Sequence, residues 1–162
     1  MHDDTGLPAH DPLRPHSHEP NPEPPTAVPD VTLELPNGRV LTLDLPTLHN
    51  LPAVTVENCI IVSTGHGASG PFAFRGVPLL ALVQAYWSGA WRQVAVHSAD
   101  GFGNRVLRAE LEQPDPAGPI LLAYACDGVP LTRPQGLVRL IVPSERDDAL
   151  RQVKWVARVL VI

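Results

Sequence analysis

The residues of this chain that could do chemistry gather around one apolar stretch and the turn that follows it. Residues 54–79 contain Cys59, one of only two cysteines, then Ser63 and a glycine-rich turn that includes His66. Glycines let a backbone approach a ligand closely, so a small-molecule site is expected at this turn. Ser63, His66 and Asp100 are the residue types of a nucleophilic triad, but their spacing does not demand one. The chain also lacks the G-x-S-x-G elbow that presents a catalytic serine.

The glycine motif of this stretch and the cysteines of the chain predict neither a dinucleotide site nor a zinc site. Residues 65–70, GHGASG, match G-x-G-x-x-G, but a dinucleotide site needs a helix to begin there. The following PFAF segment is extended and aromatic, so the sequence does not favour a Rossmann site. Neither C-x-x-C nor H-E-x-x-H occurs, which argues against zinc. Cys59 lies in an apolar run and is predicted to be a core residue.

Composition points to one globular domain of 162 residues with 44% hydrophobic content. The formal net charge of −5 is carried entirely by residues 1–30, which hold six acidic residues and one arginine. A neutral body with an acidic tail excludes nucleic acid and anionic membranes as expected partners. No run reaches the roughly 18 apolar residues that span a bilayer. The beginning of the chain does not resemble a secretory signal, so the predicted location is cytoplasmic.

The tail and the body differ sharply in residue type. Residues 1–30 contain eight prolines, four histidines and almost no large apolar residues. Such a segment cannot bury enough surface to offset the entropy of ordering it, so we expect a disordered, solvated leader rather than a metal site. The predicted folded domain is 31–162.

The apolar patterns of that domain predict many strands and few helices. Residues 31–35 and 40–45 alternate around Pro36-Asn37-Gly38, which is typical of a hairpin. Residues 54–62 are apolar on both faces in their second half and predict a central strand. Further strands are expected at 72–75, 92–98, 104–107, 120–125, 138–142 and 153–162. A short helix or turn is expected at 46–51, a helix at 78–86, a helical turn at 108–112 and a short helix at 144–150. The fold class is therefore α+β, a β-rich mixed sheet with few short helices.

Seven segments in this order resemble the oxidoreductase molybdopterin-binding domain, the fold of the sulfite oxidase family. They are LTLDLPTLHNLP, VTVENCIIVSTGHG, FRGVPLLALV, HSADGF, ILLAYACDGVPL, GLVRLIVP and VKWVARVLVI, and they span roughly residues 31–162. The resemblance implies a pterin cofactor whose dithiolene binds molybdenum. It also implies oxygen-atom transfer or related redox chemistry.

The resemblance breaks at the metal ligand. Catalytic members end the corresponding strand in Cys-x-Gly-Asn, and the cysteine thiolate binds molybdenum. On this sequence that pattern falls on Ser63-Thr64-Gly65-His66, so Ser63 stands at the ligand position and His66 at the Asn position. Cys59 lies four residues earlier, about 13 Å away along a strand, and cannot simply replace it. A serine hydroxyl is less acidic and is a harder donor than a thiol, whose pKa is near 8.5.

The resemblance also implies other cofactor-binding positions. Asp100-Gly101-Phe102 matches the turn that edges the cofactor pocket, and Lys154 matches a position near the pterin phosphate. Arg75 and Arg105 are further cations that an anionic cofactor could use. Each has an alternative reading, since Asp100-Gly101 is an ordinary turn sequence and Lys154 suits a solvated strand position.

Two hypotheses follow. The first is a molybdopterin-binding oxidoreductase with Ser63, Gly65 and His66 at the metal-facing turn. The second is a non-catalytic scaffold of the same fold that binds another small ligand or a protein partner. A purely structural role stays open, and the sequence does not identify a substrate, an electron acceptor or an oligomeric state.

Overall fold

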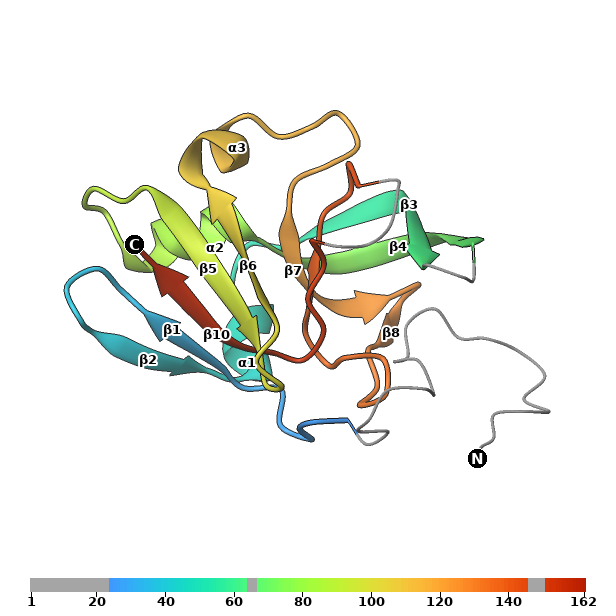
Figure 1. Ribbon diagram of the computed structural model, residues 1–162, viewed down its shortest axis with the longest axis horizontal. Helices are drawn as coiled ribbons and strands as arrows, with labels where there is room; N and C mark the ends of the chain where they lie inside the picture. Colours follow the sequence, from blue (N-terminus) through green and yellow to red (C-terminus); the bar gives the residue numbers. More distant parts are fainter. Residues whose placement is uncertain (1–23, 64–66, 146–150) are drawn as a thin grey trace.

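A computed structural model describes residues 24–63, 67–145 and 151–162 of the chain. They form two five-stranded β-sheets and three short α-helices (Figure 1). The strands are β1 (Val31–Glu34), β2 (Val40–Leu43), β3 (Val54–Ser63), β4 (Gly67–Pro78), β5 (Gln93–Ser98), β6 (Gly103–Leu107), β7 (Leu121–Cys126), β8 (Val129–Pro130), β9 (Arg139–Ile141) and β10 (Val156–Val161). The helices are α1 (Leu45–His49), α2 (Leu79–Tyr86) and α3 (Arg108–Glu112).

The first sheet joins the two ends of the domain. Its strand order is β2-β1-β10-β5-β6, and β1 pairs in parallel with β10. The β1–β2 hairpin forms as predicted, because Gly38 takes a φ of 88° at the turn and Leu35 N–H donates to Arg39 O. Helices α1 and α2 lie behind this sheet in Figure 1.

The second sheet is covered on both faces. Its order is β3-β4-β7-β8, and β9 also pairs with β7. Successive side chains of a strand point to opposite faces. Leu122 and Tyr124 of β7 accordingly join the core between the two sheets, whereas Leu121 and Ala123 join a second core around Phe74. The doubly covered centre of this sheet is therefore β7.

The prediction of β3 as a central strand is wrong, because β3 lies at the edge of its sheet. Its register with β4 shifts between Val56 and Cys59, next to Asn58 with a φ of 61°. That bulge turns both Val56 and Cys59 toward the second core, where Cys59 is 4% exposed. Within the apolar run Cys59 and Ile61 are buried, whereas Ile60 between them is partly exposed, so the two faces of the strand are not equally covered.

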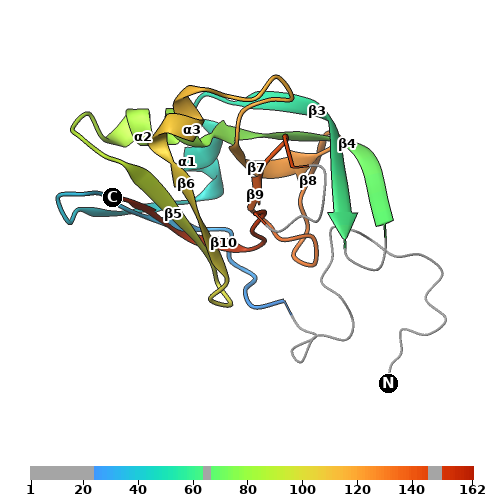
Figure 2. The ribbon, with the colours of Figure 1, turned by 45° about the horizontal axis from the view of Figure 1, so that its top comes forward.

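The β3–β4 hairpin extends beyond its sheet (Figure 2). Strand β7 pairs with β4 only from Phe74 to Pro78, and Asp127 N–H donates to Ala73 O. Earlier residues of β4 pair only with β3 among the described residues. The hairpin thus continues from the sheet as a two-stranded ribbon.

Most other predicted elements are confirmed, including the helices at 79–86 and 108–112. The long strand predicted over 153–162 begins only at Val156, because Trp155 takes a φ of 50°. The predicted helix at 144–150 lies mainly outside the described residues, and Ser144 lies in a turn. The short strand β8 was not predicted. Along the described parts of the chain, no helix is long and apolar enough to cross a membrane.

Candidate functional site

The β5–β6 turn contains three of the predicted site residues. Gly101 takes a φ of 94°, which favours glycine, and its N–H donates to Ser98 O. Asp100 Oδ1 accepts a hydrogen bond from Phe102 N–H at 3.1 Å. The carboxylate therefore stabilises the turn. Phe102, at the tip of the turn, is 51% exposed.

This turn is joined directly to the segment that carries Lys154. Ala99 N–H donates to Trp155 O at 2.9 Å, and Trp155 N–H donates to Gly136 O at 2.9 Å. The indole Nε1–H of Trp155 donates to Arg133 O at 2.7 Å. Lys154 Nζ lies 5.9 Å from the centre of the Trp155 ring, within reach of a cation–π interaction. The structure thus brings Asp100, Phe102 and Lys154 to one end of the first sheet.

The backbone of this junction is held in an uncommon conformation. Trp155 has a φ of 50° and Leu137 a φ of 58°, which bulky residues rarely adopt. Each such residue costs on the order of 1–3 kcal/mol, and they concentrate at functional sites. Hydrogen bonds on both sides of Trp155 hold it in place.

Ser63, the residue at the metal-ligand position, lies elsewhere. It ends β3, with Gly67 as its partner across the hairpin. The ends of the β3–β4 hairpin and of the β5–β6 hairpin lie apart in both views (Figures 1 and 2). Gly65 and His66 lie outside the described residues. The structure therefore does not bring the predicted metal position beside the predicted phosphate position.

The two predicted arginines are also separate from Ser63. Arg75 lies opposite Thr55 of β3. Thr55 is eight residues before Ser63, and eight residues of a straight strand span about 26 Å. Its Nη1 donates to Thr55 Oγ1 at 3.2 Å. Arg105 lies on β6 opposite Ala95 and is exposed. Of the predicted cations, Arg105 follows the Asp100 turn on β6, and Lys154 is joined to the turn by the hydrogen bond between Ala99 and Trp155.

The described residues do not supply a thiolate at a candidate metal position. Cys59 is 4% exposed and Cys126 is 9% exposed, and both belong to the second core. Across residues 24–63, 67–145 and 151–162, no group of three or more His, Cys, Asp or Glu residues could hold a metal ion.

Sequence reasoning missed an ion pair that fixes the segment leading to Lys154. The guanidinium of Arg151 donates two hydrogen bonds to the Glu110 carboxylate, at 2.6 and 2.7 Å. These bonds lower the pKa of Glu110 and raise that of Arg151, while partial burial opposes both shifts. The two residues are 41 positions apart, so no local pattern signals the pair.

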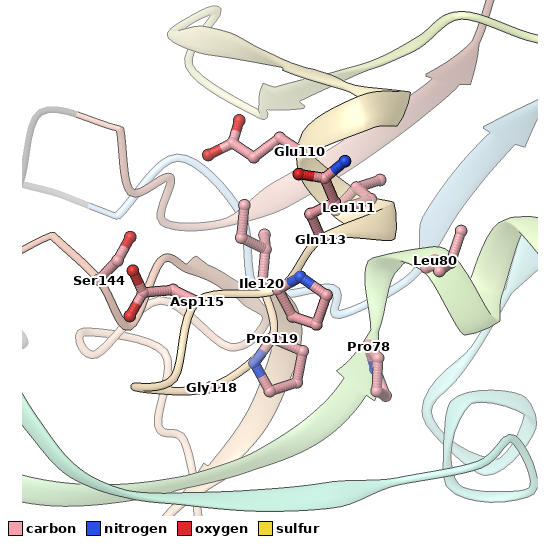
Figure 3. Close-up of a pocket in the computed structure, with 11 residues that line it drawn as sticks. Pro78, Leu80, Glu110, Leu111, Gln113, Asp115, Gly118, Pro119, Ile120 and Ser144 are labelled. Carbon is pink, nitrogen blue, oxygen red and sulfur yellow. The ribbon is translucent and has the colours of Figure 1, made fainter.

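Sequence reasoning also missed a pocket beside α3, which Figure 3 shows. Glu110 and Asp115 carry carboxylates at its rim, so its charge is the wrong sign for an anionic cofactor. A pterin cofactor is therefore not expected to bind in this pocket.

Comparison with known proteins identifies the family. The model of the oxidoreductase molybdopterin-binding domain matches residues 28–162. The chain belongs to this family. The family model covers all the described strands and helices, and the sequence-based resemblance is confirmed.

Comparison of structures agrees on the fold. The crystal structure of the sulfane dehydrogenase SoxCD from Paracoccus pantotrophus matches with a TM-score of 0.65 and 18% sequence identity. The match covers 82% of this chain but only 37% of the SoxCD chain. At this identity the likeness shows the fold alone. A search of curated protein sequences found no match.

The donor groups of this molybdopterin-binding domain fit one part of the family cofactor better than the other. Lys154, next to the Asp100–Phe102 turn, supplies the positive charge that a phosphate needs. A sulfite-oxidase-type metal ligand requires a thiolate, and both cysteines are buried in the core. The arrangement therefore suits the organic anion and does not suit thiolate ligation of molybdenum.

Proposed function

We propose that this domain binds the anionic pterin part of a molybdopterin cofactor beside the β5–β6 turn, without thiolate ligation of molybdenum. The observation that carries the proposal is the hydrogen bond from Ala99 N–H to Trp155 O, which joins the turn to the segment of Lys154. Lys154 holds the phosphate, and Asp100 and Gly101 fix the shape of the turn beside it. When bound to the pterin, molybdenum would supply oxygen-atom-transfer redox chemistry.

Lys154 is suited to this role by its partly buried position. It is the only lysine of the chain, and it is half-buried beside Trp155. A phosphate bound there gains charge-assisted hydrogen bonds in a partly desolvated place. Removing one such bond costs roughly 1.5–3 kcal/mol, which corresponds to a loss of affinity of about tenfold or more.

Catalytic competence is doubtful in this proposal because Ser63 stands at the ligand position. Coordination through the Ser63 oxygen is the remaining route to a metal-bound form, since the described cysteines are buried. The second candidate function is a non-catalytic scaffold that binds a different small ligand or a protein partner. The separation of the hairpin end from the β5–β6 turn favours this alternative.

The first test is metal and pterin analysis of the full chain purified from a host that synthesises the cofactor. Stoichiometric pterin, detected by fluorescence after oxidation, is expected whether or not molybdenum is present. Absence of pterin in such a preparation would overturn the proposal and leave the scaffold function.

The second test locates the pterin. Lys154→Gln should lose bound pterin, whereas Lys154→Arg keeps the positive charge and should retain most of it. Amine acylation offers an independent readout, because Lys154 and the N-terminal amine are the only reactive amines of the unmodified chain. Bound pterin should slow acylation of Lys154 and leave the N-terminal amine unchanged; equal rates with and without pterin would contradict this location.

A further inference from the structure

The pocket beside α3 is lined by residues of α2, of α3 and of the loop before β7. Its volume is about 170 Å³. The residues that define it come from the first turn of α2, from α3 and from the loop before β7: Leu80, Glu110, Leu111, Asp115, Pro119 and Ile120. It lies at the end of β6 that leads into α3, opposite the end that begins at the Asp100 turn. The pocket is therefore separate from the position proposed for the pterin.

The inner wall of the pocket is apolar and fixed. Leu111 is 6% exposed and Ile120 is 8% exposed, and both belong to the core between the sheets. An engineered apolar cavity of about 150 Å³ is large enough to bind benzene. The pocket thus has room for a single ring or a short aliphatic group, but not for a nucleotide or a pterin.

The rim of the pocket carries oriented negative charge. Arg151 holds the Glu110 carboxylate with two hydrogen bonds. Asp115 Oδ1 accepts a hydrogen bond from Ala117 N–H at 2.8 Å, which orients the second carboxylate. Figure 3 shows Asp115 beside Ser144 at one side of the pocket, Ile120 and Pro119 in the middle, and Pro78 and Leu80 at the other side. The carboxylates of Glu110 and Asp115 and the guanidinium of Arg151 together carry a net negative charge, which lies beside the apolar wall of the pocket.

We propose that this pocket binds a small organic cation whose apolar body is about the size of one ring and which carries a protonated amine. The apolar body lies against Leu111, Pro119 and Ile120. The ammonium group donates to the carboxylate of Asp115. Glu110 is already hydrogen-bonded to Arg151, so it contributes mainly electrostatic attraction to the ammonium group.

The test uses three probes of one shape: benzylammonium, neutral benzyl alcohol and benzoate. Each is titrated into the isotopically labelled full chain and followed by amide chemical shifts. Benzylammonium should bind with a dissociation constant on the order of 1 mM, as expected for a ligand with few atoms. Benzyl alcohol should bind several-fold more weakly, and benzoate should not saturate. Binding of benzylammonium should also weaken as salt is raised, because the rim is open to solvent.

Two variants and one control locate the ligand. Asp115→Asn keeps the oxygen that accepts from Ala117 N–H but removes the charge, and should weaken benzylammonium by about two- to fivefold. Leu80→Trp should fill the pocket and abolish saturable binding of benzylammonium. If Leu80→Trp does not fold, Asp115→Asn alone still tests the location of the ligand. Glu112→Gln is the matched control, since Glu112 lies on the same helix, pairs with Arg108 and does not line the pocket.

Three outcomes would overturn the proposal: no saturable shifts with benzylammonium, equal affinity for benzoate, or equal weakening by Glu112→Gln and Asp115→Asn. None of these bears on pterin binding, which is measured at Lys154, so the two proposals can fail independently.

Discussion

Removing the ion pair between Glu110 and Arg151 should loosen the attachment of the segment before β10 to α3. Both side chains are about one-third exposed, Arg151 at 35% and Glu110 at 37%, so solvent screens the charges. Exposed pairs contribute roughly 0.2–1 kcal/mol, and the two-bond geometry places this pair toward the upper end. We therefore expect a coupling energy of about 1 kcal/mol at pH 7. It is measured by urea unfolding of Glu110→Gln, Arg151→Gln and the double variant.

The coupling should also depend on pH with a defined sign. The hydrogen bonds from Arg151, opposed by partial burial, hold the pKa of Glu110 below its usual 4.5. A carboxyl group with a lower pKa in the folded state contributes stability above its unfolded pKa, and that stability is lost as the pH falls through the folded pKa. The coupling energy should therefore be constant from neutral pH down to about 4.5 and disappear below the folded pKa.

The pair Arg108–Glu112 provides the comparison. It is a single contact of 2.9 Å between side chains that are 42% and 47% exposed, so its coupling energy should be smaller. A coupling energy for Glu110–Arg151 that persists unchanged once Glu110 is protonated would refute the electrostatic explanation. A value no larger than that of Arg108–Glu112 would show that the two-bond geometry adds nothing.

Three further substitutions test how the fold is held together. Gly76→Ala should abolish soluble folded protein, because a Cβ at Gly76 would overlap the backbone of Leu122 on β7; expression and circular dichroism check this. Phe74→Ala should cost about 3–5 kcal/mol in the free energy of unfolding, because the ring is fully buried in the second core; chemical denaturation measures it. Asp44→Ala should lower the melting temperature by removing the N-cap of α1, where Asp44 accepts two hydrogen bonds from Thr47 that lower its pKa. The difference from wild type should be full above the ordinary pKa of 3.8, which applies to the unfolded chain, and should be lost as the pH falls through the lower pKa of the folded state.

Local patterns predicted the elements of this fold well where the turn chemistry is explicit. The alternation around Pro36-Asn37-Gly38 identified the β1–β2 hairpin, and Pro78 marked the start of α2. Both signals act within a few residues, so the sequence alone can carry them.

The errors arose where a single residue changes the backbone conformation. Asn58 and Trp155 both take positive φ values, one producing the bulge in β3 and the other delaying the start of β10. Asn tolerates a positive φ, but its presence in a strand pattern does not demand one. Trp rarely adopts a positive φ, and at Trp155 the hydrogen bonds with Ala99 and Gly136 hold this conformation. The edge position of β3 was missed for a different reason, since an apolar run looks alike in a central strand and in an edge strand.

The candidate site was predictable only in part for a related reason. The family segments contain Asp100 and Lys154, and the fold joins the two positions through Ala99 and Trp155, while their role at the cofactor stays a prediction. Arg75 and Arg105 were selected by charge alone, and charge does not specify which end of a strand a residue occupies. The Glu110–Arg151 pair depends on contacts across 41 positions, which no local spacing encodes.

The position of Ser63 makes the question of metal ligation separable from the question of stability. Beyond Ala73, the β3–β4 hairpin pairs only with itself among the described residues, so its end lies outside the doubly covered part of the sheet. Cys59 and Ile61 of this ribbon still pack in the second core, but Ser63 comes after them at the end of β3. Ser63→Cys should therefore leave the free energy of unfolding nearly unchanged while adding a thiol at the family's ligand position. If molybdenum is retained only in that variant, the serine is what prevents ligation; if neither protein retains it, the chain lacks more of the metal site than one sulfur atom.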